Sequence, residues 1–320
     1  MVAVAIVTFL AKRLIAVGAL LLVVSLLVFS LLALSPGSIV ATLVGTRPTT
    51  PELIASIEAE YHVNDPFLAQ YWHWLAGAVH GDFGRSIQSG QPVTAMIADR
   101  LPVTLGLAGY ALLLVVAIGI PAGMAAGMRR GRAFDRAVST AAVVGMSAPP
   151  FAVGILLAYV FGVTLDLFPV YGAGEGIAER IQHLTLPAFA LATILLALII
   201  RQTRAATLDV MEQDYITFAR ARGLSRPRIL VSYALRNTAL PIVTVAGLLL
   251  IVAVSGAVLV ETVFSLQGIG LLMIDSITGK DIPVVQGVAF IIAIFVTAVN
   301  LVVDLLSLVI NPRTRYPVEA

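Results

Sequence analysis

Histidine, cysteine and an exposed serine are the side chains by which a chain of this kind could hold a metal or attack a substrate. The four histidines, His62, His73, His80 and His183, show no H-x-x-x-H or H-E-x-x-H spacing. Cysteine is absent, which excludes thiolate catalysis and cysteine metal sites. Ser147 lies in GMSAPP and not in the G-x-S-x-G turn that exposes a nucleophile. We therefore expect no catalytic residue and no metal site.

Nucleotide chemistry is equally unsupported by the sequence. The chain contains no G-x-x-x-x-G-K-[ST] phosphate loop, and Gly279-Lys280 is followed by Asp281. We expect no cofactor in this chain and no enzyme activity of its own. If ATP supplies energy to this protein, another polypeptide must bind it.

The amino-acid composition indicates whether the chain folds in water or in lipid. Of 320 residues, 59% are hydrophobic and 12% are charged, whereas soluble domains carry about 25% charged residues. The mean hydropathy is +0.99. A net charge of +2 gives no argument for nucleic-acid binding. The sequence predicts an all-α integral membrane protein in contact with lipid.

Six apolar stretches are long enough to cross about 30 Å of hydrocarbon as helices. They are Leu14–Leu34, Val103–Met128, Ala137–Leu165, Ile181–Ile200, Pro241–Val260 and Ile282–Ile310. The first is too long for the apolar region of a cleaved signal peptide, so we expect a retained anchor.

The distribution of Lys and Arg predicts the orientation of these spans. With a cytoplasmic N-terminus, 15 of the 20 basic residues fall in inside segments. Because basic residues favour the cytoplasmic side, we expect both termini there. The chain then divides into residues 1–34 with the first span, an external helical subdomain at 35–101, and a five-helix core at 102–320. The core contains a long inside segment at 201–240.

Two helices are expected in the external subdomain. Thr49 and Glu52 form a capping box before apolar positions Leu53, Ile57 and Tyr61. A second helix, about Pro66 to Val79, places Phe67, Tyr71, Trp74 and Leu75 on one face. That face could lie in the membrane interface or pack on the subdomain's own core.

Glycine and proline mark two of the spans. Gly119, Gly123 and Gly127 share one helix face and permit close helix approach, within this chain or against a partner subunit.

Proline should kink or break the same span at Pro121 and the next span at Pro149 and Pro150. These three prolines are candidate hinges, although permanent bends are the commoner explanation of such prolines.

Charged residues near the spans are interpreted structurally. Asp304 is the one acid expected inside a span, near the end where Arg313 and Arg315 follow. Arg201 and Arg204 should extend from the end of the fourth span to the interface.

The inside stretch Asp214 to Pro241 reads as two short helices joined at Gly223 and the turn Ser225-Arg226-Pro227. The first is small and cationic, so it could dock into a groove of a soluble partner. A solvated loop that only fixes topology is the alternative.

This stretch resembles the coupling segment of ABC-importer permeases, in the version of the dipeptide, oligopeptide and nickel permease family. The matching positions are Ala219, Gly223, Leu235, Asn237 and Pro241. Thr217-Phe218-Ala219 replaces the Glu-Ala-Ala of the general importer motif. Further matches occur in order along nearly the whole chain, at 27–38 (LVFSLLALSPGS), 81–93 (GDFGRSIQSGQPV), 97–107, 260–270 (VETVFSLQGIG), 281–287 and 300–316. Leu266-Gln267 and Asn311 depart from the family pattern.

The resemblance implies the type I importer permease fold in a bacterial inner membrane. It also implies a second homologous permease, two ATP-binding subunits that hold ATP and Mg, and an extracytoplasmic solute-binding protein. The residues implied to contact the ATPase are Asp214, Tyr215, Ala219, Arg220, Arg222, Gly223 and Leu224.

Peptides are the cargo that the resemblance favours. A nickel or small-solute importer of the same family is an alternative, and an ion-driven transporter is a more distant one, because neither internal repeats nor mid-membrane charges are visible. The external subdomain and the loop from Glu261 to Pro283 are candidates for docking the binding protein and for an outer gate. Substrate-binding residues cannot be named from the sequence.

Overall fold

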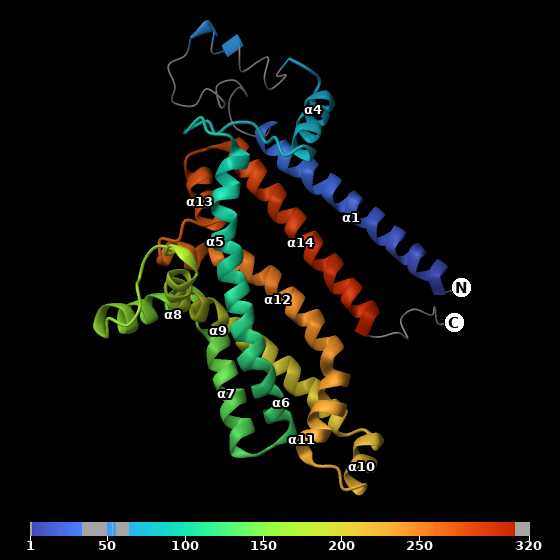
Figure 1. The fold of residues 1–320 in the computed structure, drawn as a ribbon. Coiled ribbons are helices and arrows are strands. Elements are labelled where there is room, and N and C mark those ends of the chain that lie inside the picture. The colour runs from blue at the N-terminus through green and yellow to red at the C-terminus, as the bar shows by residue number, and fades with distance from the viewer. Residues whose placement is uncertain (1, 34–49, 53, 56–63, 311–320) are drawn as a thin grey trace. The chain divides into compact units, whose positions relative to one another are not determined.

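The computed structural model describes residues 2–33, 50–52, 54–55 and 64–310 (Figure 1). Its residues group into two compact units. The first unit contains the described residues of 3–102 and 268–298, and the second contains those of 103–267 and 299–320. Thr49, Leu53, Ile57, Tyr61, Arg313 and Arg315, on which predictions were made, lie outside the described residues.

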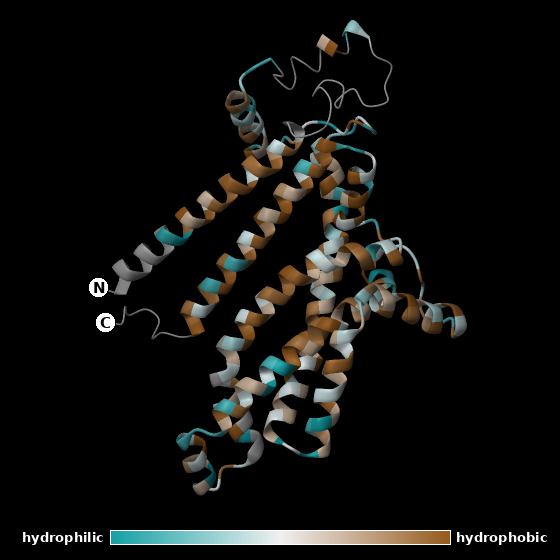
Figure 2. Ribbon diagram, turned by 180° about the vertical axis from the view of Figure 1, so that it is seen from behind, coloured by the Kyte–Doolittle hydropathy of each residue, from teal (hydrophilic) through white to brown (hydrophobic). Residues whose placement is uncertain are grey.

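Helices make up nearly all of the described chain. The only β pairing in these ranges is an isolated antiparallel bridge between Arg85 and Pro92. Five helical stretches are long and apolar enough to cross a membrane, and Figure 2 shows the apolar residues along them. They are Ala11–Leu31 within α1 (Val2–Ala33), Val93–Met128, α9 (Gly176–Met211), Pro241–Val263 within α12 (Arg236–Val263), and α14 (Ile282–Ile310).

The remaining predicted span, Ala137–Leu165, is not one straight helix. It consists of α7 (Ala133–Ser147) and α8 (Pro150–Leu157), followed by a π-helical segment, Ala158–Thr164, with a bend of 100° between the two parts. Ala148 and Pro149 have extended backbones, with ψ of 122° and 136°. Each precedes a proline, which disfavours the helical conformation. The bend therefore follows from Pro149 and Pro150.

Pro121 has a smaller effect. The second span runs through α5 (Val93–Leu114), a π-helical segment (Val115–Gly119) and α6 (Ile120–Met128). Pro121 lies at the start of α6, directly after the π-helical segment. A π-bulge widens the helix locally, which accommodates a residue that lacks a backbone N–H. The helix thus continues past Pro121, so the break that was one of the predicted outcomes does not occur.

The inside segment 201–240 contains more helix than expected. α9 continues through Met211, beyond the predicted end at Ile200. α10 (Asp214–Ala221) is the expected short helix. The second is not separate, because α11 (Arg226–Ile229) and a π-helical segment, Leu230–Leu235, run into α12 without a gap.

The core of the second unit surrounds α9, which packs against α6, α7, α8 and α12. Leu191, Leu195 and Ile199 are fully buried along its length. Because these residues recur four positions apart, they form a buried apolar stripe along one face of α9.

The core of the first unit explains the aromatic face of α4 (Phe67–Val79). Tyr71 and Leu75 are buried in a cluster with Phe29 of α1 and Phe290 of α14. The Trp74 and Phe290 rings lie edge to face, 5.7 Å apart. The Tyr71 hydroxyl also lies 2.8 Å from Ser25 Oγ of α1. The face thus packs on a core, but that core is shared with α1 and α14 and is not the subdomain's own, as one prediction had it.

Candidate functional site

α10 carries most of the residues predicted to contact an ATPase, and it is anchored on one side. Ile216 and Ala219 are buried against Met124 of α6 and Val210 of α9. The same cluster includes Ile229 and Ala234 from the start of the next helix. Burial of this face holds α10 firmly on the end of the second unit.

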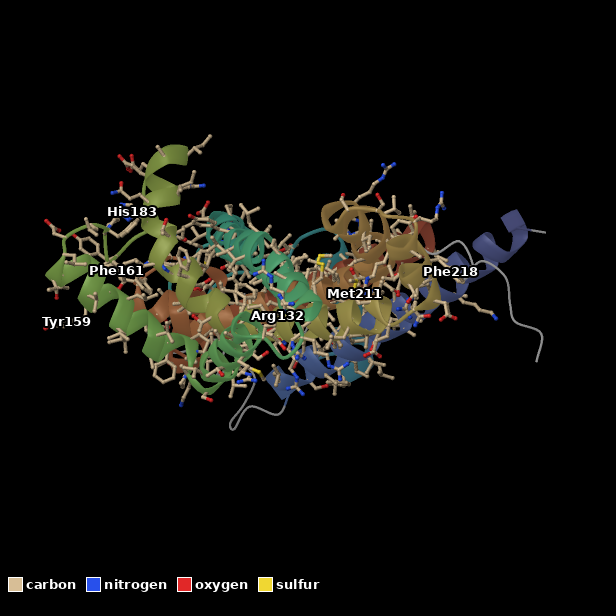
Figure 3. The ribbon with its side chains drawn as sticks, turned by 90° about the horizontal axis from the view of Figure 1, so that it is seen from below. Arg132, Tyr159, Phe161, His183, Met211 and Phe218 are labelled. Atoms are coloured by element: carbon tan, nitrogen blue, oxygen red, sulfur yellow. The ribbon has the colours of Figure 1, made fainter. Side chains whose placement is uncertain are left out.

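The opposite side of α10 is exposed. Phe218 is 69% exposed and Tyr215 is 39% exposed, with the Tyr215 ring stacked on Tyr233 at 6.4 Å. Arg220 and Arg222 are exposed as well. Figure 3 views the protein from this end, where Phe218 is labelled. An aromatic side chain flanked by arginines is the composition that protein interfaces favour.

Gly223 ends α10 with a left-handed backbone, at φ +75°. The Gly223 amide donates to the Arg220 carbonyl at 2.9 Å, and the Leu224 amide donates to the Ala219 carbonyl at 3.2 Å. Leu224 then packs against the apolar cluster under α10. A Cβ at Gly223 would meet no atom within 4 Å, so only the backbone conformation requires glycine here.

Asp214 lies in the first turn of α10, where a carboxylate favours the helix dipole. The predicted set of seven residues thus divides in two. Ala219, Gly223 and Leu224 fix the position of α10, whereas Asp214, Tyr215, Arg220 and Arg222 lie on its exposed surface.

An ion pair that the sequence did not indicate braces the helices behind α10. Arg204 of α9 donates two hydrogen bonds to Asp135 of α7, from Nε at 2.5 Å and from Nη2 at 2.9 Å. Asp135 also accepts the Gly131 amide at 2.9 Å. The interpretation of Arg204 as a side chain that reaches to the interface is therefore wrong, because its guanidinium holds a buried carboxylate within the protein.

A second pair lies on the surface of the same end. Arg130 Nη1 is 2.6 Å from Glu212 Oε1, and both side chains are 66% exposed. Glu212 directly follows α9 and lies two residues before α10. The Arg130–Glu212 pair thus joins the α6–α7 turn to the end of α9, and the Asp135–Arg204 pair joins α7 to α9. Of the two, only the Asp135–Arg204 pair is largely buried.

The three glycines lie against α9. A Cβ at Gly123 would lie 2.7 Å from the Ile200 carbonyl oxygen and 2.8 Å from Thr203 Cβ. At Gly127 it would lie 2.8 Å from Thr207 Cβ, and at Gly119 it would overlap Ile199. Close approach of α6 to α9 therefore needs glycine at these positions.

In the first unit, the segment 81–93 forms a turn around a buried carboxylate. Asp281 accepts hydrogen bonds from the Ser86 hydroxyl at 2.5 Å, the Ile87 amide at 3.0 Å and the Gln88 amide at 3.4 Å. Gly84 and Gly90 hold the turn with φ of +77° and +69°. The sequence placed Asp281 in an outer loop and at the start of the family-matching stretch 281–287, with no contact to 81–93. The structure shows that it organises the Gly-Asp-x-Gly-x-Ser element.

The loop predicted from Glu261 to Pro283 is largely helical. It contains α13 (Ile269–Thr278), and its first residue belongs to α12. Glu261 is fully buried and accepts a hydrogen bond from Thr104 Oγ1 at 2.6 Å. The interpretation of Asp304 as the one acid inside a span is therefore wrong, because Glu261 lies within the apolar stretch Pro241–Val263. The extension of α12 beyond Val260 could not be read from hydropathy.

The described residues of this site provide surfaces for binding. Among the residues that the structure describes, no three His, Cys, Asp or Glu side chains are grouped as metal ligands. His183 Nδ1 lies 3.0 Å from the Tyr171 carbonyl oxygen, and His80 Nδ1 lies 2.7 Å from that of Ala76. Both histidines have local structural roles.

Comparison with known proteins identifies the class. Residues 119–316 match the binding-protein-dependent transport system inner membrane components, and residues 6–108 match the N-terminal domain of such membrane components. The chain belongs to this family. It is a membrane-spanning permease subunit of an ABC importer, as the resemblance predicted.

Individual relatives cover almost the whole chain. The dipeptide transport system permease protein DppB of Escherichia coli (strain K12) is 37% identical over 319 residues, covering 92% of this chain and 94% of the relative. The probable peptide ABC transporter permease protein y4tP of Sinorhizobium fredii (strain NBRC 101917 / NGR234) is 37% identical over 309 residues, covering 95% and 98%.

The fold is also similar to a solved structure, an inward-facing conformation of the MetNI methionine ABC transporter. That similarity has a TM-score of 0.58 at 18% identity, and it covers 68% of this chain and 96% of the solved chain. The predicted all-α type I importer permease fold is thereby confirmed.

Proposed function

We propose that this chain and a second, homologous permease form the path through which an ATP-driven importer carries peptides across the bacterial inner membrane. A solute-binding protein delivers the peptides on the outer side. Two ATP-binding subunits or domains, which hold ATP and Mg, act on the inner side through α10. The chain itself performs no catalysis in this proposal.

The observation that carries the coupling role is the two-sided character of α10. Its inner face is buried in an apolar cluster, while Phe218 projects from its outer face. Phe218 lies beside the exposed Arg220 and Arg222, and aromatic and arginine side chains are enriched at protein interfaces. A groove of an ATPase would cover Phe218, and the anchored face would transmit the movement of that groove to α6 and α9.

Peptide cargo is supported by the relatives. The relatives described above, which cover more than 90% of this chain, are named for dipeptide and peptide transport. The described residues do not identify a substrate-binding side chain, so the cargo proposal depends on these relatives.

Orientation and domain organisation complete the proposal. Because basic residues are concentrated near α10 and at the N-terminus, both termini and residues 201–240 face the cytoplasm. Residues 35–101 then lie outside, between the first span at 1–34 and the core at 102–320. The turn held by Asp281 presents a preformed surface on that side for the binding protein.

Substitution of Phe218 tests the docking role. We expect Phe218→Ala to weaken association with the ATPase by about 30-fold or more, as for a buried aromatic anchor of an interface. The readout is the ATPase recovered with a tagged chain from detergent-solubilised membranes. Phe67→Ala, which removes a phenylalanine that is 40% exposed on α4, is the matched control. Equal ATPase recovery with both variants would refute the docking role.

Gly223 permits a test that separates backbone conformation from side-chain size. Gly223→Val should uncouple ATP hydrolysis from uptake, because a β-branched residue resists φ near +75°. Gly223→Asn should keep coupling, because asparagine tolerates this conformation. The measurement is the ratio of peptide uptake to ATP hydrolysis in reconstituted vesicles. Normal coupling in Gly223→Val would contradict the proposal.

Cargo is tested by removing the chain from its native cells. Uptake of labelled dipeptides and longer peptides should fall to background, and expression of the chain should restore it. Uptake of labelled nickel serves as the control and should not change. Loss of nickel uptake with intact peptide uptake would replace the peptide proposal by the nickel alternative.

A further inference from the structure

The turn between α6 and α7, taken together with the first turn of α7, carries four arginines within eight residues: Arg129, Arg130, Arg132 and Arg136. All four are exposed. The nearby acids are already used, since Asp135 is bound by Arg204 and Glu212 pairs with Arg130. Within the described residues, Arg129, Arg132 and Arg136 form no ion pair. Three cations of this turn therefore remain available to an external anion.

Exposed apolar side chains lie two turns further along α7, beyond Ser139 and Thr140 on the same face. Val143 and Val144 are 65% and 64% exposed, and they follow Arg136 by seven and eight residues on the same face of α7. That spacing places them about 11 Å along the helix from Arg136. Phe134 is also partly exposed, with the Arg129 guanidinium 5.0 Å above its ring. Cations at the start of α7 thus share a helix face with an exposed apolar pair two turns away.

The sequence also gives the turn an expected place relative to the membrane. It follows Met128, where the apolar stretch of the second span ends, so we expect it near the lipid headgroups. Figure 3 shows Arg132 at the same end as Phe218 but apart from it, so an ATPase seated on α10 would not have to cover the turn.

We propose that Arg132 and Arg136 bind the headgroup of an anionic phospholipid whose acyl chain lies along Val143 and Val144. Guanidinium groups bind phosphate oxygens in pairs of hydrogen bonds. A soluble anion would satisfy the arginines but not the valines, and a zwitterionic lipid would satisfy the valines with little gain from the charges. An anionic phospholipid satisfies both. This site is separate from the coupling surface and does not depend on the cargo.

The test measures lipid retained by the assembled complex, purified through a tag on this chain into nanodiscs. Native mass spectrometry compares phosphatidylglycerol with phosphatidylcholine over a concentration series. We expect preferential retention of phosphatidylglycerol, weakened about fivefold by Arg132→Gln or by Arg136→Gln at low salt. Arg136→Lys should keep most of the affinity, because it keeps the charge. Arg180→Gln, which removes an exposed arginine at the other end of α9, is the matched control.

Three results would overturn the proposal. The first is a lack of selectivity: the two lipids are retained equally, or Arg180→Gln lowers retention as much as Arg136→Gln does. The second is displacement of phosphatidylglycerol by 10-fold excess inorganic phosphate over lipid, which would make the turn a site for soluble anions. The third is lipid bound to the isolated chain but excluded from the complex, which would make this face of α7 a protein interface.

Discussion

Asp135 and Asp281 are equally buried, at 3% exposure each, yet they are stabilised in different ways. In the second unit, Asp135 is held by the Arg204 guanidinium. In the first unit, Asp281 accepts hydrogen bonds from a hydroxyl and two backbone amides, all neutral donors. The Arg204 guanidinium joins α9 to α7 through Asp135. The neutral donors to Asp281 come from one turn, so they fix the shape of that turn.

The difference indicates two mechanical roles. The Asp135–Arg204 pair ties α7 to the central helix α9, so that α10 and the helices behind it can move as one body. Asp281 instead preserves a local surface. Removing one partner should therefore be most costly for the charged pair, because it leaves a charge without compensation.

The largest effect is expected for Asp135→Asn. It leaves the Arg204 guanidinium without its carboxylate, and we expect the free energy of unfolding to fall by about 2–3 kcal/mol. The range is at the low end for buried pairs because the Arg204 side chain is 30% exposed. Denaturant unfolding of the purified chain in mixed micelles measures it. The double variant Asp135→Asn/Arg204→Gln should lose less than the two single losses together, and full additivity would contradict a direct pair.

A smaller loss of free energy of unfolding is expected for Gly123→Ala, which tests the close contact between α6 and α9 beside the Asp135–Arg204 pair. The added methyl meets the Ile200 carbonyl and Thr203, and we expect a loss of about 2 kcal/mol in the same unfolding measurement. Gly109→Ala in α5, where a Cβ meets nothing within 4 Å, is the control and should not destabilise the chain. Similar losses in both variants would argue against the close contact.

Asp281→Asn should cost about 1–2 kcal/mol, because the new amide nitrogen faces N–H and O–H donors instead of accepting from them. The same unfolding assay measures the loss. Ser86→Ala removes one donor and should cost about 1 kcal/mol. If Asp281→Asn were as costly as Asp135→Asn, the distinction between charged and neutral partners would be wrong.

The smallest effect is expected for Arg130→Gln. Both members of the Arg130–Glu212 pair are largely exposed, so its loss should change the free energy of unfolding by less than about 0.5 kcal/mol. A loss comparable to that of Asp135→Asn would show that exposure is a poor guide to the strength of these pairs.

Hydropathy predicted the membrane-spanning stretches well, because a span in lipid must be continuous and apolar. It failed at their ends. α9 continues through Arg201 and Arg204 to Met211, and α12 includes Glu261, because helices extend beyond the apolar region when side chains find partners there. Pro149 and Pro150 predicted a kink or a break between α7 and α8, but the angle of 100° could not be predicted from the sequence.

The candidate site was predictable where one short segment determines it. α10 and the turn at Gly223 follow from local sequence. The Asp135–Arg204 pair joins residues 69 positions apart, and the Asp281 turn joins residues nearly 200 apart. Neither pairing has a local signal. The backbone amides that bind Asp281 are aimed by positive φ angles at Gly84 and Gly90, which sequence alone does not reveal.

The bend at Pro149 and Pro150 has a consequence for how the protein is made. Residues 133–164 contain both arms of the bend, and the two prolines favour the bent form as soon as this segment is made. In the folded chain the bent segment also packs on a helix that is synthesised later, since Gly145 lies beside Thr193, and Gly154 beside Ala190, both of α9. The contacts that hold the bend in place are therefore completed only once α9 has been made.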